Sequence, residues 1–197
     1  MNMNFKEAVF IKSAALFERC VPDLGKEVAF VGRSNAGKSS ALNTLVGHPI
    51  ARVSKLPGRT QLINFFGLDD THRLVDLPGY GYARVTDEIK RRWKKNLTRY
   101  CESRESLVGV VLLCDVRHLL KEQDAVLIEW VLSANKPVHI LLTKADKLSK
   151  NEALRQLKAM KESLEGIENV SVQLFSALSH QGLEGLEKQL CHWFFPE

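Results

Sequence analysis

The sequence lacks the long apolar segments that membrane anchoring or export would need. No stretch approaches the roughly eighteen consecutive apolar residues that indicate a membrane-spanning helix. The N-terminal segment carries Glu7 in its polar start and has no long apolar core, unlike a secretion signal. These absences predict a cytoplasmic protein with no membrane partner.

Cysteine is sparse and scattered. Cys20, Cys101, Cys114 and Cys191 form no CxxC pair and no Cys/His pair at the spacing of metal ligands. This pattern predicts reduced thiols in a reducing compartment, not a disulfide framework or a zinc site.

Low-complexity segments, internal repeats and interdomain linkers are also missing. With 197 residues, of which 45% are hydrophobic and 26% charged, the chain fits one globular domain with a sizeable core. The net charge of +5 is small, so where the basic residues lie matters more than their excess.

What is present is an alternation of short β-branched runs with longer helical patterns. Strands are predicted at 28–32, 61–68, 72–77, 107–115, 137–143 and 170–176, with an extra edge strand at 7–14. Helices are predicted at 38–46, 87–102, 121–134, 150–164 and 182–194. Several strands are almost wholly apolar, as in strands covered on both faces, so we predict a mostly parallel α/β sheet with helices on both sides.

The first strand leads into a phosphate-binding motif. Residues 32–39 read GRSNAGKS, which fits G-x-x-x-x-G-K-[ST] between a strand and a helix. Gly32 and Gly37 can adopt backbone shapes that turn N–H groups toward a phosphate. Lys38 is predicted to neutralise the β and γ phosphates and Ser39 to bind Mg²⁺. The motif does not distinguish ATP from GTP.

A second motif selects the base. Residues 143–146 read TKAD after a buried strand, at the sheet edge where open α/β sheets bind ligands. Asp146 can accept hydrogen bonds from N1–H and the 2-amino group of guanine, whereas adenine offers neither. Lys144 can cover the base, and Ser176 or Ala177 can offer a backbone N–H to guanine O6. Guanine is therefore the predicted base.

A third motif senses the triphosphate. Residues 76–79 read DLPG, in which Asp76 is predicted to hold a water of the magnesium shell and the Gly79 N–H to contact the γ-phosphate. The aperiodic segment at 48–60 suits a switch loop, and Thr60 is its natural magnesium hydroxyl.

The chain resembles the EngB (YihA/YsxC) family of bacterial GTPases of the TRAFAC class. The resemblance is carried by five segments in order: GRSNAGKSS, PGRTQLINFF, DLPGYGYA, TKAD and FSA. The runs around PGRTQ and DLPGYGYA are the most specific, and FSA the least. The resemblance implies a three-layer P-loop NTPase fold, a Ras-like G domain at 25–197 and an N-terminal extension at 1–24 packed on it. It also implies binding of GTP with Mg²⁺, and a role in cell division, septation and large ribosomal subunit assembly.

Carried onto this sequence, the family pattern implies a set of nucleotide contacts and two magnesium ligands, Ser39 and Thr60. The predicted nucleotide contacts are Gly32, Arg33, Ser34, Asn35, Ala36, Gly37, Lys38, Ser39, Gly58, Arg59, Thr60, Gln61, Leu62, Asp76, Leu77, Pro78, Gly79, Thr143, Lys144, Ala145, Asp146, Phe175, Ser176 and Ala177.

The residue after DLPG bears on the rate of hydrolysis. Ras-like proteins carry there a glutamine that orients the attacking water, whereas this chain has Tyr80, so we predict slow GTP hydrolysis. Lys38, Asn35 and Gly79 are the predicted catalytic residues. Related GTPases use an asparagine like Asn35 to bind a monovalent cation such as K⁺. The alternative, that Asn35 only shapes the loop, stays open.

A basic helix follows this motif. In residues 87–102, Ile89, Trp93, Leu97 and Cys101 recur every four residues and are predicted to face the core. The other faces carry Lys90, Arg91, Arg92, Lys94, Lys95 and Arg99, and a second basic run holds Lys144, Lys147, Lys150, Arg155, Lys158 and Lys161.

The first basic helix predicts contact with ribosomal RNA of a large-subunit precursor, although a solvated helix face is the plainer interpretation. The rival function, a signalling or trafficking GTPase with a protein effector at a membrane, fits less well. Cys191 lies in CHWFFPE and not in a C-a-a-X box, and no glycine follows Met1. A metabolic kinase would leave TKAD unexplained. We expect a monomer.

Overall fold

One mixed sheet organises the chain. The computed structural model describes residues 3–51, 62–81 and 87–196, without the side chains at 87, 89, 90, 92 and 93. Within these residues the strand order is β1-β3-β4-β2-β5-β6-β7. The strands are β1 (Val9–Ala14), β2 (Lys26–Gly32), β3 (Ile63–Gly67), β4 (His72–Asp76), β5 (Leu107–Asp115), β6 (Val138–Thr143) and β7 (Val170–Leu174). The β1–β3 and β3–β4 pairs are antiparallel and the rest are parallel.

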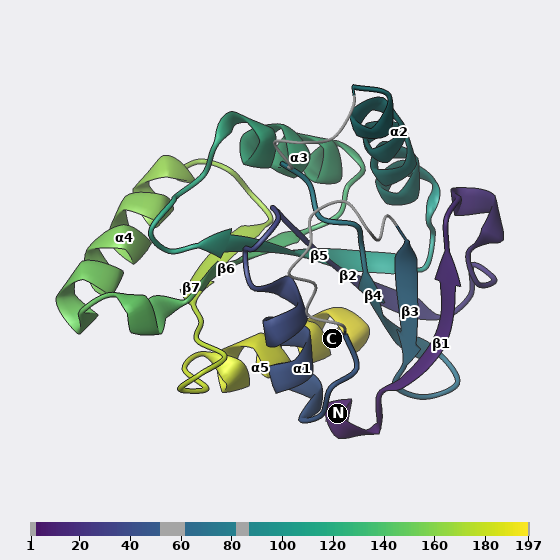
Figure 1. Cartoon of the computed structure of the whole chain (residues 1–197), viewed down its shortest axis with the longest axis horizontal. Helices are drawn as coiled ribbons and strands as arrows, with labels where there is room; N and C mark the ends of the chain where they lie inside the picture. Colours follow the sequence, from purple (N-terminus) through teal and green to yellow (C-terminus); the bar gives the residue numbers. More distant parts are fainter. Residues whose placement is uncertain (1–2, 52–61, 82–86, 197) are drawn as a thin grey trace.

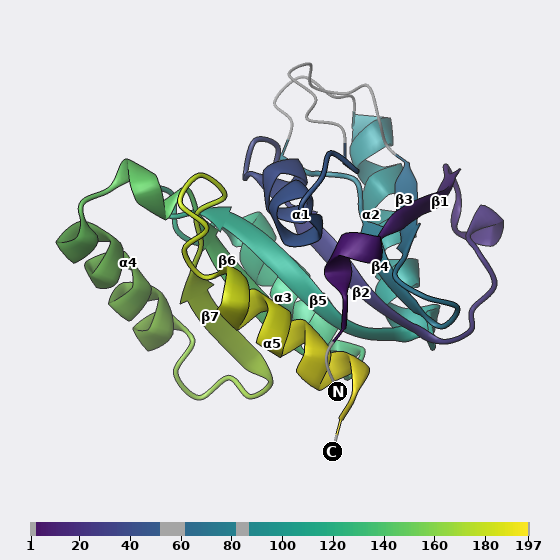
Figure 2. The same ribbon diagram turned by 90° about the horizontal axis from the view of Figure 1, so that it is seen from below.

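Helices cover both faces of the sheet (Figures 1 and 2). They are α1 (Lys38–Val46), α2 (Asp87–Ser103), α3 (Glu122–Ser133), α4 (Lys150–Ser163) and α5 (Leu183–Phe194). Alternate residues of β2 point to opposite sides: Ala29 and Val31 join the core under α2, α3 and α4, while Val28 and Phe30 join the core under α1 and α5. This two-sided burial confirms the predicted three-layer α/β fold.

The predicted elements are confirmed except at some ends. The strand expected at 61–68 is described only as Ile63–Gly67, and a turn follows it. In that turn the Asp69 carboxylate accepts hydrogen bonds from the N–H groups of Thr71 (2.7 Å) and His72 (2.8 Å). An aspartate that bonds the backbone two and three residues on favours a turn over a continuing strand.

The N-terminal residues form part of the same sheet. β1 pairs with β3, with a register shift between Phe10 and Lys12. It is one of the two outer strands of the sheet. The short 3-10 helix η2 (Phe17–Arg19) then lies against α2, where Glu18 forms an ion pair with Arg99. Because residues on both sides of position 24 build one sheet, the division into 1–24 and 25–197 stays a prediction.

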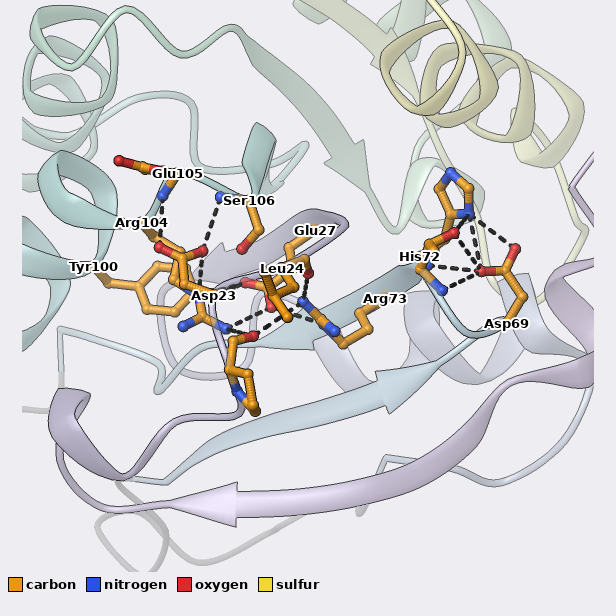
Figure 3. A network of polar contacts seen from close by, with 12 residues as sticks. Asp23, Leu24, Glu27, Asp69, His72, Arg73, Tyr100, Arg104, Glu105 and Ser106 are labelled. Carbon is orange, nitrogen blue, oxygen red and sulfur yellow. Dashed lines mark hydrogen bonds and ion pairs between the residues drawn. The ribbon is translucent and has the colours of Figure 1, made fainter.

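A buried charged cluster holds the C-terminal end of α2 (Figure 3). The Glu27 carboxylate, 0% exposed, accepts hydrogen bonds from Arg73 (2.8 Å), Tyr100 (2.6 Å) and both Nε and a terminal nitrogen of Arg104 (2.9 and 2.7 Å). Asp23 lies 3.5 Å from Arg104. Such a buried carboxylate is tolerated because its lone pairs are satisfied by charged and hydroxyl donors. The cluster lies where β2 and β4 begin, at the sheet edge opposite to the ends of β2, β5 and β6.

Candidate functional site

The turn between β2 and α1 is shaped for an anion. Asn35 and Gly37 have φ values of 64° and 88°, in the left-handed region, and the Ala36 N–H donates to the Arg33 carbonyl at 3.0 Å. A left-handed residue beside a helix start turns successive N–H groups to one side. α1 begins at Lys38, so the dipole of a helix N-terminus adds to this preference for negative charge.

Lys38 and Asp76 meet at this turn. The Lys38 ammonium forms an ion pair with Asp76 Oδ1, and the two side chains are only 15% and 11% exposed. The other oxygen, Asp76 Oδ2, accepts a hydrogen bond from the Asn64 amide at 3.3 Å. A lysine at the start of α1 and a carboxylate at the end of β4 suit a phosphate with its counter-cation.

The residues present also fit Mg²⁺. Ser39 lies in the first turn of α1, next to Lys38, whose ammonium forms the ion pair with Asp76. In the described part of the chain, no group of three His, Cys, Asp or Glu side chains could hold a metal alone. Mg²⁺ keeps several waters and takes one or two protein ligands besides phosphate oxygens, so Ser39 is a ligand of the type it uses.

The DLPG segment runs alongside the phosphate loop. The Leu77 N–H donates to the Phe30 carbonyl (2.9 Å) and the Tyr80 N–H to the Gly32 carbonyl (3.3 Å), while the Ser34 N–H donates to the Tyr80 carbonyl (2.8 Å). Pro78 and Gly79 lie between these bonds. The motif predicted to sense the γ-phosphate is thus fixed to the loop predicted to hold it.

The TKAD segment joins the same loop from the other side. Thr143 Oγ1 donates to the Ala36 carbonyl at 2.6 Å, and the Lys144 ammonium donates to the Asn35 carbonyl at 2.6 Å. Lys144 also lies 3.0 Å from Asp115 Oδ2. Burial would raise the pKa of Asp115, but hydrogen bonds from Arg117 and Lys144 outweigh it and hold that pKa well below its ordinary value. Asp115 is therefore a fixed anion that steadies Lys144.

The carboxylate predicted to select the base is held in place by the next loop. Asp146 Oδ1 accepts a hydrogen bond from Ser176 Oγ at 2.6 Å, and the Ala145 N–H donates to the Phe175 carbonyl at 3.1 Å. The Ser176 hydroxyl is the main cause that lowers the pKa of Asp146, so this side chain is a pure acceptor at neutral pH. The Ser176 N–H donates to the Gln181 carbonyl, which leaves Ala177 as the backbone donor expected for guanine O6.

Part of the predicted set lies outside the described residues. These are Gly58, Arg59, Thr60 and Gln61, whose contacts stay predictions from sequence. Leu62, just before β3, is described and half-buried.

Sequence reasoning missed three side chains at the site: Asn64, Asp115 and Asp124. Asp115 ends β5 in register with Thr143, and its place after an apolar strand could have revealed it. Asn64 faces Asp76 only through the β3–β4 register, and the role of Asp124 depends on a contact with Tyr80 across the fold. No pattern in the sequence indicates either contact.

α2 carries basic side chains beside this site. Arg91, Lys94 and Lys95 are exposed, and the Lys94 ammonium lies 4.8 Å from the centre of the Trp130 ring on α3. Arg99 differs, because its ion pair with Glu18 engages its charge within the fold. Leu97, Tyr100 and Cys101 face the core; the predicted inward side chains of Ile89 and Trp93 lie outside the described part.

The chain is similar in sequence to known GTP-binding proteins. A family model described as "50S ribosome-binding GTPase" matches residues 27–144. The probable GTP-binding protein EngB of Coxiella burnetii is 48% identical over 195 residues, which cover 98% of this chain and 95% of that protein.

Among solved structures, a probable GTP-binding protein engB has a TM-score of 0.67 at 24% identity, covering 85% of this chain and 98% of that one. Era, in complex with MgGDPNP and a segment of 16S ribosomal RNA, has a TM-score of 0.67 at 22% identity over 88% of this chain and 58% of its own. These two likenesses concern the fold.

Among the described helices, none is both long and apolar enough to cross a membrane. The fold, the three motifs at one sheet edge and the identity to a curated relative lead to one conclusion: the chain belongs to the EngB family of GTP-binding proteins and is a P-loop GTPase.

Proposed function

We propose that the protein is a cytoplasmic switch that binds GTP or GDP with Mg²⁺, hydrolyses GTP slowly, and in its GTP form docks on a precursor of the large ribosomal subunit. Its part in cell division and septation belongs to the same proposal. One observation carries it: the phosphate loop, DLPG and TKAD are bonded to one another at one edge of the sheet.

In this proposal each motif has one task. The N–H groups of residues 32–39 surround the β-phosphate, and Lys38 exchanges its contact with Asp76 for phosphate oxygens. Ser39, with Thr60, holds Mg²⁺, which neutralises charge on the phosphate oxygens when bound. The Gly79 N–H donates to the γ-phosphate only in the triphosphate state.

The base is read by a pre-arranged acceptor. Asp146, held by Ser176, accepts hydrogen bonds from both guanine donors, and Lys144 lies across the base plane. Adenine would leave this carboxylate without those donors, which costs about 1–3 kcal/mol or more. The site therefore prefers GTP.

Slow hydrolysis follows from the position of Tyr80. Its side chain is 4% exposed and its hydroxyl donates to Asp124 on α3, so it does not reach the phosphate side. Lys38, Asn35 and Gly79 are then the residues left to stabilise charge on the transferred phosphoryl group. For Asn35 the two sequence-based interpretations, cation ligand or loop former, lead to different K⁺ dependence of hydrolysis.

The ribosomal partner is supported by chemistry and by family. The matching family model is described as ribosome-binding, and α2 presents Arg91, Lys94 and Lys95 beside the DLPG strand end. A phosphate backbone is the polyanion that such a basic surface recognises. Because α2 follows the triphosphate-sensing segment in the chain, its position can depend on the nucleotide.

The test is co-sedimentation with purified large-subunit precursors in GDP and in a non-hydrolysable GTP analogue across a salt series. We expect association with the analogue, weaker association with GDP, and loss of both as salt rises. Binding to anionic vesicles with no binding to subunits would reject the ribosomal role and favour a membrane effector.

A further inference from the structure

The residue after DLPG is anchored away from the nucleotide. Tyr80 lies in the core beneath α2 and α3, and its hydroxyl is 2.5 Å from Asp124 Oδ1. Burial first, and then the Asp124 carboxylate, raise the pKa of Tyr80 far above its ordinary value, so the hydroxyl keeps its proton and donates. A buried donor on a buried acceptor is a strong, directional contact.

Asp124 joins three parts of the site. It is 1% exposed in the first turn of α3, where its second oxygen accepts the Lys121 N–H at 2.9 Å. The same oxygen lies 3.9 Å from a guanidinium nitrogen of Arg33, which belongs to the phosphate loop. One carboxylate thus contacts the residue after Gly79, the phosphate loop and the start of α3.

Backbone bonds place this contact next to the γ-phosphate sensor. Tyr80 forms a parallel bridge with Arg33, through its N–H to the Gly32 carbonyl and its carbonyl to the Ser34 N–H. The peptide that carries the Gly79 carbonyl and Tyr80 N–H is therefore fixed at one end by the sheet and by the side chain of Tyr80. Gly81, with φ of 75°, then turns the chain away.

We propose that Asp124 and Tyr80 are positioning residues. They hold the Gly79 N–H where the γ-phosphate of GTP binds and so set the preference of the site for GTP over GDP. Neither side chain touches the nucleotide. This inference rests on the proposed contact between the Gly79 N–H and the γ-phosphate.

The contact between the Gly79 N–H and the γ-phosphate distinguishes GTP from GDP because GDP has no γ-phosphate. Releasing the Tyr80 hydroxyl lets the DLPG segment adopt several positions, and the γ-phosphate must then select one of them at a cost in affinity. The β-phosphate and the base are held by residues 32–39 and by TKAD, whose bonds to Tyr80 are made by its backbone and not by its hydroxyl. Loss of the contact should weaken GTP binding and spare GDP binding.

The experiment measures affinity for GDP and for a non-hydrolysable GTP analogue, with Mg²⁺, in the full chain. Tyr80→Phe and Asp124→Ala should each lower the affinity for the analogue about five- to tenfold, which is within the usual range of coupling between sites. The affinity for GDP should stay within about twofold of the wild-type value. The double variant should bind the analogue no more weakly than the more affected single variant, because both single variants remove the same Tyr80–Asp124 hydrogen bond. Asp124→Asn should keep most of the preference for the analogue over GDP, since an amide at this position can still form a hydrogen bond with the Tyr80 hydroxyl.

The chain offers a matched control. Tyr100 also donates its hydroxyl to a buried carboxylate, Glu27, at 2.6 Å, but at the opposite edge of the sheet. Tyr100→Phe removes the same atom from a similar environment and should lower stability without changing the ratio of the two affinities.

Three results would overturn the inference. These are equal losses for GDP and the analogue in Tyr80→Phe, additive losses in the double variant, or the same change of ratio in Tyr100→Phe. If Asp124→Ala folds poorly, its melting temperature shows this, and Tyr80→Phe, which removes only the hydroxyl, carries the test. Wild-type protein that binds neither nucleotide would instead reject the proposed function, before any variant is compared.

Discussion

Asp146 is the side chain to which the proposed function assigns the choice of base. Its carboxylate is oriented by the Ser176 hydroxyl at 2.6 Å and has its pKa lowered, so it accepts and does not donate. The arrangement predicts specificity that a single atom can change.

In Asp146→Asn one acceptor becomes a donor. GTP should bind about 5- to 100-fold more weakly, since a hydrogen bond to a charged group is lost, while XTP, with a carbonyl in place of the 2-amino group, should bind more tightly. Competition binding with GTP and XTP measures both. Ser176→Ala is the control, because it frees the carboxylate without changing its chemistry and should weaken GTP with no gain for XTP. An unchanged GTP preference in Asp146→Asn would show that another residue selects the base.

At the scale of elements, α2 has two ends with different roles. Its C-terminal end is fixed by Tyr100 and Arg104 on Glu27 and by Arg99 on Glu18. Its exposed cations lie nearer the N-terminal end, toward the DLPG segment. The end of α2 that is fixed to the core is thus distinct from the part that carries the exposed cations.

Charge reversal tests that basic end. Arg91→Glu with Lys95→Glu should abolish co-sedimentation with ribosomal precursors and leave GTP affinity intact. If residual binding can be followed, its slope of log affinity against log salt should fall by roughly 1.4–1.8 for two lost phosphate contacts. Arg155→Glu with Lys161→Glu is the control, since it changes the net charge equally on α4, which lies beyond α3 from α2 (Figure 1). Equal loss in both double variants would mean that total charge, not α2, governs binding.

The sequence predicts most of this architecture because each element carries its own pattern. The apolar run of β5 and the helical patterns of α1 and α4 are local, and the structure confirms those elements at their predicted starts. The three nucleotide motifs are also local. The contacts of Asn64 and Asp124 were not predictable, because they depend on strand register and on how α3 packs against the DLPG segment. Local patterns give the elements and the chemistry, whereas the contacts between elements need the fold.

At the scale of the whole molecule, a buried histidine links stability to pH. His139 on β6 is 4% exposed, with Ser171 (2.7 Å) and Gln173 (3.0 Å) on its two ring nitrogens and the Trp193 ring of α5 beside it. Burial lowers the pKa of His139 to about 4 from the ordinary 6.5. The neutral ring is therefore the form that the fold accepts.

The sign of the pH effect follows. Between the two pKa values the unfolded chain binds a proton that the folded chain does not, so stability is full above pH 6.5 and falls as the pH drops toward 4. By pH 5 this group should cost about 2 kcal/mol of unfolding free energy. Urea denaturation without nucleotide at pH 7.5 and pH 5 measures the loss. His139→Gln, which does not titrate, should lose about 2 kcal/mol less over the same interval, and an identical loss would assign the effect to other groups.

The strand order also constrains how the protein can fold while it is being made. A chain leaves the ribosome N-terminus first, yet β1 pairs with β3, and β2 pairs with β4 and β5, all of which are synthesised later. Glu27 likewise precedes its hydrogen-bond donors in the chain: Arg73 is synthesised after it, and Tyr100 and Arg104 later still. Before Tyr100 and Arg104 are synthesised, closing the sheet would bury an acid short of two of its three partners, so we expect β2 to stay accessible to solvent until roughly the first half of the chain has been made.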